Sequence, residues 1–309
     1  MMFLARISMA SACEKERFGV SLRMRQSRRR RQRLFRRNVM HKEKLFAIVG
    51  CPLGHSLSPE LHSWAFDEIG YPGIYMAFEQ KPENLARFYD AVRTLPVSGG
   101  NITIPFKVDS MRYVDGVSER AKRIGAMNTF YWKDGRLLGE NTDVTGFMAP
   151  LRGRKIDSAL ILGAGGVSRA AIVALQELGV PDIRITNRTP EKASALAEEF
   201  GIQAVPYEER TRCGCSLVIN ATCLGMKGRW QDMSAFPEEG FGGRGGLAYD
   251  IVYTPEDTKF LKDARAHGWE CQSGLAMFVE QARAAFRLWT GKDMPSEGAY
   301  ALVRRALGC

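Results

Sequence analysis

The amino-acid sequence predicts an α/β protein with two domains. Its 309 residues are more than one hydrophobic core usually serves, because single cores stop growing near ~250–300 residues. From Lys44 onward, strand patterns alternate with helix patterns, and the alternation restarts near residue 146. Early in the second half, an apolar run leads directly into a glycine-rich turn and a helix. Such alternation is typical of mainly parallel sheets that are covered by helices.

The first domain is expected to contain three buried strands, the helices between them and a hairpin. The apolar run "KLFAIVG" indicates the first strand. In the helix that follows, Ser58 can serve as the N-cap, with Pro59 at the first helical position. Pro105 is expected to end the third strand, and Asp134-Gly135 is a hairpin turn signal. Strands are expected over 44–50, 73–79 and 99–105, helices over 58–69, 82–95 and 107–124, and the hairpin over 127–141.

The second domain repeats the alternation and is followed by an unusual helix. Strands are expected over 158–162, 182–188, 215–222 and 246–253, and helices over 167–178 and 189–200. The helix over 274–291 has two apolar stripes, one containing Leu275, Val279 and Phe286 and the other Met277 and Leu288. A helix that is apolar on two sides is buried between two bodies. We therefore expect it to return to the first domain and to form one wall of a deep cleft between the domains.

The net charge of +10 is confined to the N-terminus. Residues 1–39 hold 11 Arg and one Lys against two Glu, and residues 40–309 hold 32 basic and 32 acidic side chains. The body therefore has no excess positive charge that would attract nucleic acid or an anionic membrane. Its apolar runs are also too short to span a bilayer.

Residues 1–42 are expected to form a disordered basic extension. Three interpretations of "MRQSRRRRQRLFRR" are open. It is an upstream extension of the reading frame with Met40 as the true start, a targeting segment, since transit peptides are rich in Arg and Ser, or an arm that contacts nucleic acid or lipid head groups.

The cysteines and histidines predict no metal site. The seven cysteines form no Cys-x-x-Cys pair, and with only four histidines no zinc-ligand spacing occurs. Reduced thiols in a cytoplasmic protein are expected. His55 and His62 have no neighbouring acid or nucleophile that would suggest a catalytic triad, so a structural role is favoured for both.

The turn "LILGAGGVSRA" predicts a dinucleotide site. Gly163, Gly165 and Gly166 stand between a buried strand and a helix, where glycines let backbone N–H groups approach a pyrophosphate at the helix N-terminus. Ser168 replaces the third glycine of the usual pattern, and the alternative is a plain tight turn.

The end of the next strand indicates which cofactor the turn would bind. NAD sites carry an acidic residue there for the ribose hydroxyl, whereas this strand ends in "NRT", with Asn187, Arg188 and Thr189. A guanidinium pairs with a 2′-phosphate in bidentate fashion. The sequence therefore favours NADP over NAD, the alternative for Arg188 being a solvated surface charge.

Polar residues follow the strands of the first domain. Asn101, Thr103 and Lys107 lie at the end of the third strand, which in open α/β sheets is the ligand-binding end. Hydroxyls near a helix N-terminus suit a small carboxylate, so Ser56 and Ser58 are candidates, although Ser58 could simply cap the helix. Further polar candidates are Asn128, Asn141, Thr142, Asp143, Tyr253 and Gln281. Uncharged hydrogen-bonding groups suit a ligand with several hydroxyls and reject analogues that lack them.

Nine motifs together resemble one family. "GHSLSP", "GGNITIPFK", "GAMNT", "GENTD", "GAGGVSRA", "NRT", "INAT", "YDIVY" and "GLAMFVEQA" occur in the order found in shikimate dehydrogenases, over residues 44–308. The resemblance implies an N-terminal α/β substrate domain, a Rossmann-like NADP-binding domain and reversible NADPH-dependent reduction of 3-dehydroshikimate to shikimate, on the route to aromatic amino acids. It implies domains at 43–145, completed by helices within 275–309, and at 146–274.

The resemblance also implies roles for individual residues. Lys107 would be the catalytic acid/base, partnered by Asp143. Ser56 and Ser58 would hold the substrate carboxylate. The ring hydroxyls would be bound by Asn101, Thr103, Asn128, Asp143 and Gln281, and Tyr253 would contact substrate. The cofactor residues would be Gly163, Ala164, Gly165, Gly166, Val167, Asn187, Arg188, Thr189, Lys192, Ile251 and Gly274. Two departures are Cys223 where Ser is common and Lys192 where many members have Arg.

Two other functions remain open at this level. One is a quinate/shikimate dehydrogenase that uses both NAD and NADP, because no residue excludes quinate. The other is a catalytically silent sensor of shikimate-like ligands whose basic arm binds nucleic acid, although the presence of both Lys107 and Asp143 argues against silence. A monomer or a homodimer is expected, without membrane or nucleic-acid partners.

Overall fold

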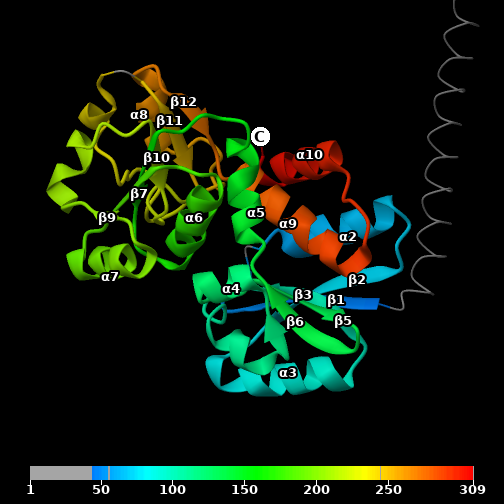
Figure 1. Ribbon diagram of the computed structural model, residues 1–309. Helices are drawn as coiled ribbons and strands as arrows, with labels where there is room; N and C mark the ends of the chain where they lie inside the picture. Colours follow the sequence, from blue (N-terminus) through cyan, green and yellow to red (C-terminus); the bar gives the residue numbers. More distant parts are fainter. Residues whose placement is uncertain (1–43, 55, 244, 309) are drawn as a thin grey trace, which may run out of the picture.

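The computed structural model describes residues 44–54, 56–243 and 245–308. Our predictions for the basic extension and for His55 therefore lie outside the described residues. The described chain forms two lobes, each built on a six-stranded sheet, with helices α5 (Asp143–Met148) and α9 (Leu275–Thr290) between them (Figure 1). The prediction of a two-domain α/β protein is confirmed.

The first lobe contains a mixed sheet with strand order β2-β1-β3-β5-β6-β4. Its strands are β1 (Lys44–Gly50), β2 (Gly73–Glu79), β3 (Val97–Ile102), β4 (Gly116–Val117), β5 (Thr129–Lys133) and β6 (Arg136–Glu140). Strand β1 pairs in parallel with both β2 and β3, whereas β5 is antiparallel to β3 and to β6. The predicted hairpin thus joins the parallel strands as an antiparallel extension.

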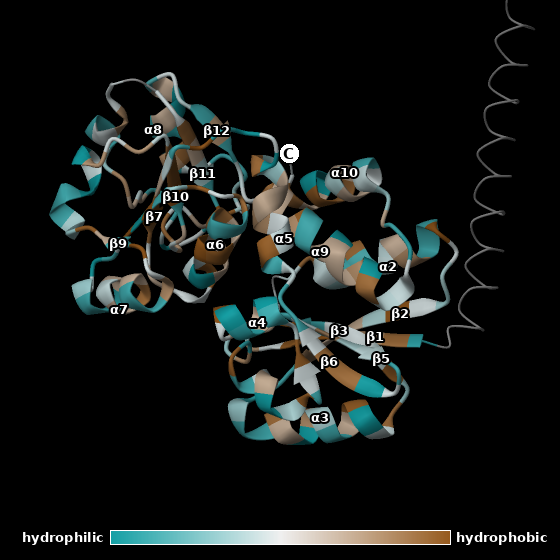
Figure 2. Cartoon of the chain, viewed as in Figure 1, coloured by the Kyte–Doolittle hydropathy of each residue, from teal (hydrophilic) through white to brown (hydrophobic). Residues whose placement is uncertain are grey.

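Helices and 3-10 turns connect these strands. They are α2 (Ser58–Glu68), η1 (Pro82–Asn84), α3 (Leu85–Thr94), η2 (Asp109–Tyr113) and α4 (Glu119–Ile124). Helix α3 alternates between teal and brown in Figure 2, as an amphipathic helix on one face of a sheet does. Two predictions were wrong in detail. Strand β3 ends at Ile102 rather than at Pro105, and strand β4 interrupts the helical stretch expected over 107–124.

The second lobe contains an entirely parallel sheet with strand order β12-β11-β10-β7-β8-β9. Its strands are β7 (Ser158–Leu162), β8 (Asp182–Thr186), β9 (Gln203–Ala204), β10 (Leu217–Asn220), β11 (Leu247–Asp250) and β12 (Glu270–Gln272), with helices α6 (Gly166–Glu177), α7 (Pro190–Phe200) and α8 (Lys259–Ala266) and turns η4 (Tyr207–Arg212) and η5 (Glu238–Phe241). The strand order reverses between β7 and β10, as in the doubly wound dinucleotide-binding fold.

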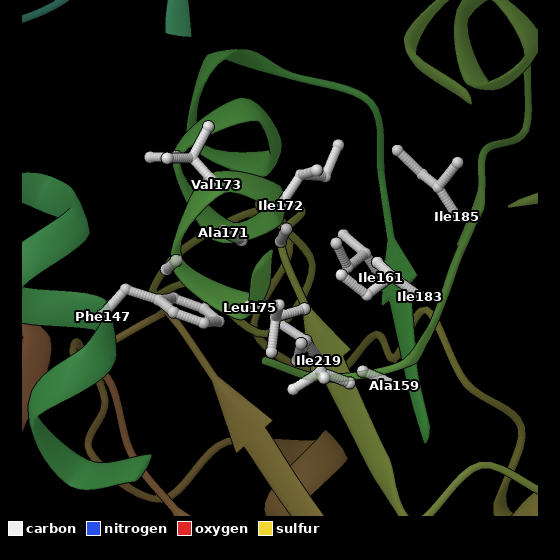
Figure 3. Packing of buried hydrophobic residues seen from close by; sticks show 14 of the residues in the cluster. Phe147, Ala159, Ile161, Ala171, Ile172, Val173, Leu175, Ile183, Ile185 and Ile219 are labelled. Atoms are coloured by element: carbon white, nitrogen blue, oxygen red, sulfur yellow. The ribbon is translucent and has the colours of Figure 1, made fainter. Parts of the chain in front are cut away.

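Helix α6 is the centre of the second lobe's core. All six residues from Ala170 to Leu175 are buried, because the helix packs against the sheet on one side and against α5 on another. Figure 3 shows Phe147 reaching from α5 toward α6, with Ile161, Ile183 and Ile219 on the strands beneath. Each such side chain contributes roughly 1.5–3 kcal/mol through burial.

Helix α9 links the two cores, as its apolar stripes predicted. Leu275, Val279 and Phe286 belong to the core of the first lobe, whereas Met277 belongs to that of the second. The second stripe is shorter than expected, because Leu288 is 37% exposed. The last helix, α10 (Ser296–Leu307), packs on α9 and α2. Within the described residues, no helix combines the length and apolarity needed to cross a membrane.

Glycine at position 146 lets α5 lie directly against α9. A Cβ on Gly146 would be 2.4 Å from the Met277 carbonyl oxygen and 2.9 Å from the Cβ of Gln281. Because the first of these contacts is with backbone, no side-chain rearrangement would relieve it. The small residue therefore fixes the distance between the two helices that connect the lobes.

His62 lies in an aromatic cluster within the first lobe. Its ring is fully buried, stacks on Tyr75 at a centroid distance of 4.6 Å and is 5.0 Å from the ring of Trp289. Neither ring nitrogen has a hydrogen-bond partner among the described residues. Burial lowers the pKa of His62 to about 3, so the ring is neutral at pH 7. The predicted structural role fits this position.

His62 should make the folded protein sensitive to acid. The folded-state pKa lies below the unfolded value of ~6.5, so the unfolded state binds the extra proton and the contribution of His62 to stability falls as pH decreases from about 6.5 toward 3. The raised pKa of Asp250 acts in the opposite direction in every variant compared here, so the His62 contribution is read as a difference between variants. The loss between pH 7.5 and pH 5 is about 2 kcal/mol. His62→Phe keeps the ring stack and removes this loss, as measured by urea unfolding at both pH values.

The matched control for this prediction is His267→Gln, because His267 is an exposed histidine. The control should keep the full pH dependence of the wild-type protein. A His62→Phe variant whose stability changes between the two pH values by the same amount as that of the control would contradict the assignment of this contribution to His62.

Candidate active site

The polar candidates of the first lobe come together at one edge of its sheet. Strands β1 and β3 are parallel and end at this edge, whereas β5 is antiparallel and begins there, with Asn101 opposite Thr129. The backbone N–H of Met127 donates to the Lys107 carbonyl at 2.8 Å, which holds the Lys107 loop beside the start of β5. Helix α5 begins at the same edge with Asp143.

Lys107 and Asp143 form an ion pair. The Lys107 Nζ donates to the Asp143 Oδ2 at 2.7 Å, and the two side chains are 28% and 12% exposed. The ammonium has two further hydrogens that remain for a ligand. Lys107 and Asp143 are 36 residues apart in the sequence. They meet because each of them follows a strand that ends at the same edge of the sheet.

Asn128 holds the carboxylate of this pair. Its Nδ2 donates to the Asp143 Oδ1 at 2.9 Å, and its Oδ1 accepts from the backbone N–H of Thr142 at 2.7 Å. Since a backbone N–H can only donate, the amide has a single orientation, with its NH2 group toward Asp143. Asn141 supports the same turn, because its Oδ1 accepts from the backbone N–H of Asp143 at 3.1 Å.

Asn101 is buried and its hydrogen bonds are made within the protein. The Tyr75 hydroxyl donates to its Oδ1 at 2.7 Å, and its Nδ2 donates to the Thr129 Oγ1 at 3.1 Å and the Asn128 carbonyl at 3.3 Å. Burial raises the pKa of Tyr75, which keeps the phenol a donor. Sequence reasoning missed Tyr75 and Thr129, although Tyr75 is an inward-facing position of a predicted strand.

Within the described residues, the hydroxyls of Ser58 and Thr103 make no hydrogen bond, and that of Ser56 makes one long one. Helix α2 begins at Ser58, its N-cap is Leu57, and no side chain caps it. The expectation that Ser58 serves as the N-cap was therefore wrong. The Ser56 Oγ accepts a long hydrogen bond of 3.4 Å from the Ser58 N–H. The Thr103 methyl packs over Gly50, where a Cβ would be 2.3 Å away.

Tyr253 and Gln281 approach the junction between the lobes. Tyr253 follows β11 in the second lobe, yet its ring stacks on Phe278 of α9 at 4.6 Å and belongs to the core of the first lobe. Burial raises the pKa of Tyr253. Gln281 is half-buried, and its Nε2 donates to the Phe278 carbonyl at 2.9 Å.

The glycine turn between β7 and α6 has the geometry of an anion site. Gly163 has φ +108°, and its N–H donates to the Thr186 carbonyl at 2.8 Å. Ser168, which replaces the usual third glycine, is buried and donates to the Gly163 carbonyl at 2.8 Å. A Cβ on Gly165 or Gly166 would meet nothing within 4 Å. The N-terminus of α6 therefore faces open space that a pyrophosphate fits.

The remaining cofactor candidates follow strands β8, β11 and β12 of the same parallel sheet. After β8, the Asn187 Nδ2 donates to the Thr189 carbonyl at 2.9 Å. Arg188 and Lys192 are exposed, and neither has an ion-pair partner in the part of the chain that the structure describes. Ile251 follows β11 and Gly274 follows β12. A Cβ on Gly274 would be 2.1 Å from the Ile251 carbonyl oxygen, so only glycine lets these two segments touch.

A separate hollow lies at the junction of the lobes and contains none of the predicted site residues. It has a volume of about 520 Å³ and is lined by Thr145, Ala149, Pro150, Arg152, Gln272, Ala276, Glu280 and Tyr300. In the described ranges, no group of three or more His, Cys, Asp or Glu residues could hold a metal ion.

Three family models match the chain. A model of the shikimate dehydrogenase substrate binding domain matches residues 48–130, and one described as shikimate/quinate 5-dehydrogenase matches residues 151–222. A third, the shikimate 5′-dehydrogenase C-terminal domain, matches residues 274–307.

Curated relatives and solved structures agree with these matches. A relative from Pelobacter propionicus, named shikimate dehydrogenase (NADP(+)), is 43% identical over 270 residues, which are 86% of this chain and 98% of the relative. The crystal structure of shikimate 5-dehydrogenase from Thermus thermophilus in complex with NADP(H) and shikimate has a TM-score of 0.78 at 42% identity, over 85% of this chain and 99% of that chain. Quinate dehydrogenase from Corynebacterium glutamicum in complex with NAD has a TM-score of 0.79 at 30% identity, over 85% and 99%.

Gly163→Ala should destabilise the protein. An alanine at φ +108° is strained, and its Cβ would lie 2.9 Å from the Thr222 methyl and 3.0 Å from the Ala221 carbonyl oxygen. We expect a loss of about 1–3 kcal/mol in the free energy of unfolding, measured with urea. Gly166→Ala is the control, since its Cβ meets open space and alanine favours the helix. Equal losses in both variants would exclude the backbone conformation as the cause.

Proposed function

This chain belongs to the shikimate dehydrogenase family, and we propose that Lys107 and Asp143 carry out the acid–base step of its reaction. The reaction is the NADP-dependent interconversion of 3-dehydroshikimate and shikimate. The observation that carries the proposal is the 2.7 Å ion pair between Lys107 and Asp143, at the edge of the first sheet where the polar candidates gather.

Lys107 fits the role of proton donor and acceptor. Reducing a ketone requires a hydride on carbon, which NADPH supplies when bound, and a proton on oxygen. The Lys107 ammonium stabilises the developing alkoxide and then protonates it. In the reverse direction, the neutral amine accepts the hydroxyl proton. Such general acid–base catalysis typically contributes ~10²–10⁴-fold to the rate.

Asp143 orients Lys107 and binds a substrate hydroxyl. One carboxylate oxygen faces Lys107 and the other faces Asn128, so both oxygens are held by donors from the protein. Each carboxylate oxygen accepts more than one hydrogen bond. A ring hydroxyl can therefore add to this pair without displacing either donor.

The other polar groups of this edge would bind the substrate. The hydroxyls of Ser56 and Ser58 suit the carboxylate, and Thr103 has a hydroxyl for the ring. Asn128 has one amide hydrogen beyond the one that it donates to Asp143. Asn101 would contribute through the remaining lone pair of its carbonyl, and Gln281 and Tyr253 would close the site from the side of α9.

NADP would lie along the carboxyl edge of the second sheet. The turn from Gly163 through Ala164, Gly165 and Gly166 to Val167 fits the pyrophosphate, since the space beside Gly165 and Gly166 is open. Asn187, Arg188, Thr189 and Lys192 suit the 2′-phosphate. Ile251 and Gly274 suit the nicotinamide, because Gly274 is the N-cap of α9, the helix between the lobes, and Ile251 lies directly against it.

The same proposal assigns a role to each domain and a cellular location to the protein. Residues 43–145, completed by 275–309, would bind substrate, and residues 146–274 would bind NADP, with α5 crossing the boundary. The five cysteines in the described ranges are free thiols, which supports a cytoplasmic location.

A quinate/shikimate dehydrogenase with mixed cofactor use is the second candidate. The structural similarity to a quinate dehydrogenase bound to NAD favours it. The exposed Arg188 and the lack of an acid at the end of β8 favour NADP. The third possibility, a ligand sensor without catalytic activity, is disfavoured. The ion pair between Lys107 and Asp143 lies beside polar groups that would bind substrate, as expected for an enzyme that catalyses a reaction.

Lys107→Ala should abolish most turnover with little effect on substrate affinity. Removing the proton donor lowers kcat by at least ~10²-fold, whereas the hydroxyl and amide groups that bind substrate remain. Lys133→Ala, at the end of β5 away from this edge, is the control and should retain the wild-type kcat. A near wild-type kcat for Lys107→Ala would remove Lys107 from the mechanism.

Arg188 should decide the choice of cofactor. Turnover of shikimate and of quinate, each with NADP and with NAD, is followed at the nicotinamide absorbance band. We expect shikimate with NADP to give the highest kcat/KM. Arg188→Ala should raise the KM for NADP about tenfold and leave that for NAD unchanged, because only NADP carries the 2′-phosphate with which this guanidinium would pair.

The matched control for Arg188 is Arg87→Ala, an exposed arginine on α3 that should change neither constant. If the wild-type protein uses NAD as efficiently as NADP, or quinate as efficiently as shikimate, the second candidate replaces the first.

A further inference from the structure

We propose that Asp250 is a positioning residue for the cofactor: its buried carboxylate fixes the turn that contains Ile251 and the turn that packs against Gly163. The inference rests on the proposed function, because that function places the nicotinamide beside Ile251 and the pyrophosphate beside Gly163. Neither the catalytic step nor substrate binding uses Asp250.

Asp250 is fully buried at the last position of β11 and is held by three donors. Its Oδ1 accepts from the Asn220 Nδ2 and from the backbone N–H of Val252, both at 2.9 Å, and its Oδ2 accepts from the Thr258 Oγ1 at 2.6 Å. No cation pairs with it among the described residues. Burial raises the pKa of Asp250 to about 7, against the opposing effect of the three donors.

Asn220 connects Asp250 with the glycine turn. Besides donating to Asp250, its Nδ2 donates to the Leu224 carbonyl at 2.9 Å, and its Oδ1 accepts from the Thr222 Oγ1 at 2.7 Å and the Thr222 N–H at 3.1 Å. Asn220 thus defines the turn after β10. The Thr222 methyl and the Ala221 carbonyl of that turn are the groups closest to a Cβ on Gly163.

Asp250 also fixes the segment on the nicotinamide side. Val252, whose N–H donates to Asp250, accepts from the Gly274 N–H at 3.2 Å. The first of these bonds closes a turn around Ile251, whose carbonyl touches Gly274 directly. Thr258, the third partner, accepts from the Leu261 N–H as the N-cap of α8. One carboxylate therefore holds the end of β10, the end of β11 and the start of α8.

Asparagine at position 250 would disturb this arrangement without changing its size. An NH2 group in place of Oδ1 would meet two donors, the Asn220 Nδ2 and the Val252 N–H, and one in place of Oδ2 would force the Thr258 hydroxyl to turn from donor to acceptor. Asp263→Asn is the matched control. Asp263 is also in the second lobe and mostly buried, but it pairs with Lys259 on α8 and contacts neither turn.

The experiment compares Asp250→Asn with Asp263→Asn by NADPH fluorescence titration and by steady-state kinetics. We expect Asp250→Asn to raise the Kd and the KM for NADPH about tenfold, with less than a twofold change in the KM for shikimate. Asp263→Asn should leave both constants within twofold. An unchanged NADPH Kd in Asp250→Asn, or equal rises for NADPH and shikimate, would overturn the proposal.

A second variant covers the case in which Asp250→Asn does not fold. Thr258→Val removes one of the three donors and should raise the NADPH Kd about threefold, whereas an unchanged Kd would overturn the proposal. Because NADPH binding is read without turnover, this result is independent of Lys107. Wild-type protein that binds NADPH but does not oxidise shikimate would refute the proposed function and leave the Asp250 inference standing.

Discussion

The fixed orientation of Asn128 is the constraint on which the catalytic edge depends. A buried carboxylate is costly unless donors surround it, and Asp143 has Lys107 on one oxygen and Asn128 on the other. Asn128 can donate only because the backbone N–H of Thr142 occupies its carbonyl oxygen. The position of the lysine therefore traces back to a backbone group at the start of α5, which the reaction does not touch.

The edge at which the parallel strands end has a different role in each of the two sheets. In the first lobe, the antiparallel strand β5 returns to the edge where β1 and β3 end, so one short segment delivers both Asn128 and the anchor for the Lys107 loop. In the second lobe, every strand is parallel, and successive carboxyl ends form a row long enough for a dinucleotide. Gly146 sets the spacing between α5 and α9 and so couples one edge to the other.

Much of this arrangement is predictable from the sequence, for physical reasons that also set its limits. The periodicity of the apolar residues predicts the buried strands and the helix α9 with its two apolar sides, and the cluster of glycines predicts the turn before α6. Strands β4, β9 and β12 are two or three residues long, too short to show an alternating pattern. The capping prediction for Ser58 failed because Leu57 is the N-cap, and a sequence does not show which of two adjacent residues takes the helical conformation first.

Asn128 and Asp250 show why polar residues at a strand end resist assignment from sequence alone. The side chain of each accepts from a backbone N–H, that of Thr142 for Asn128 and that of Val252 for Asp250, and each holds a neighbouring turn in place. Asn101 lies near the end of β3, and the sequence pattern predicts that it binds a ligand. Its side-chain amide instead makes hydrogen bonds with Tyr75, Thr129 and Asn128. Residue type and spacing place a polar group at the edge. Whether it faces the ligand or the framework is decided by donors and acceptors contributed by strands far away in the sequence.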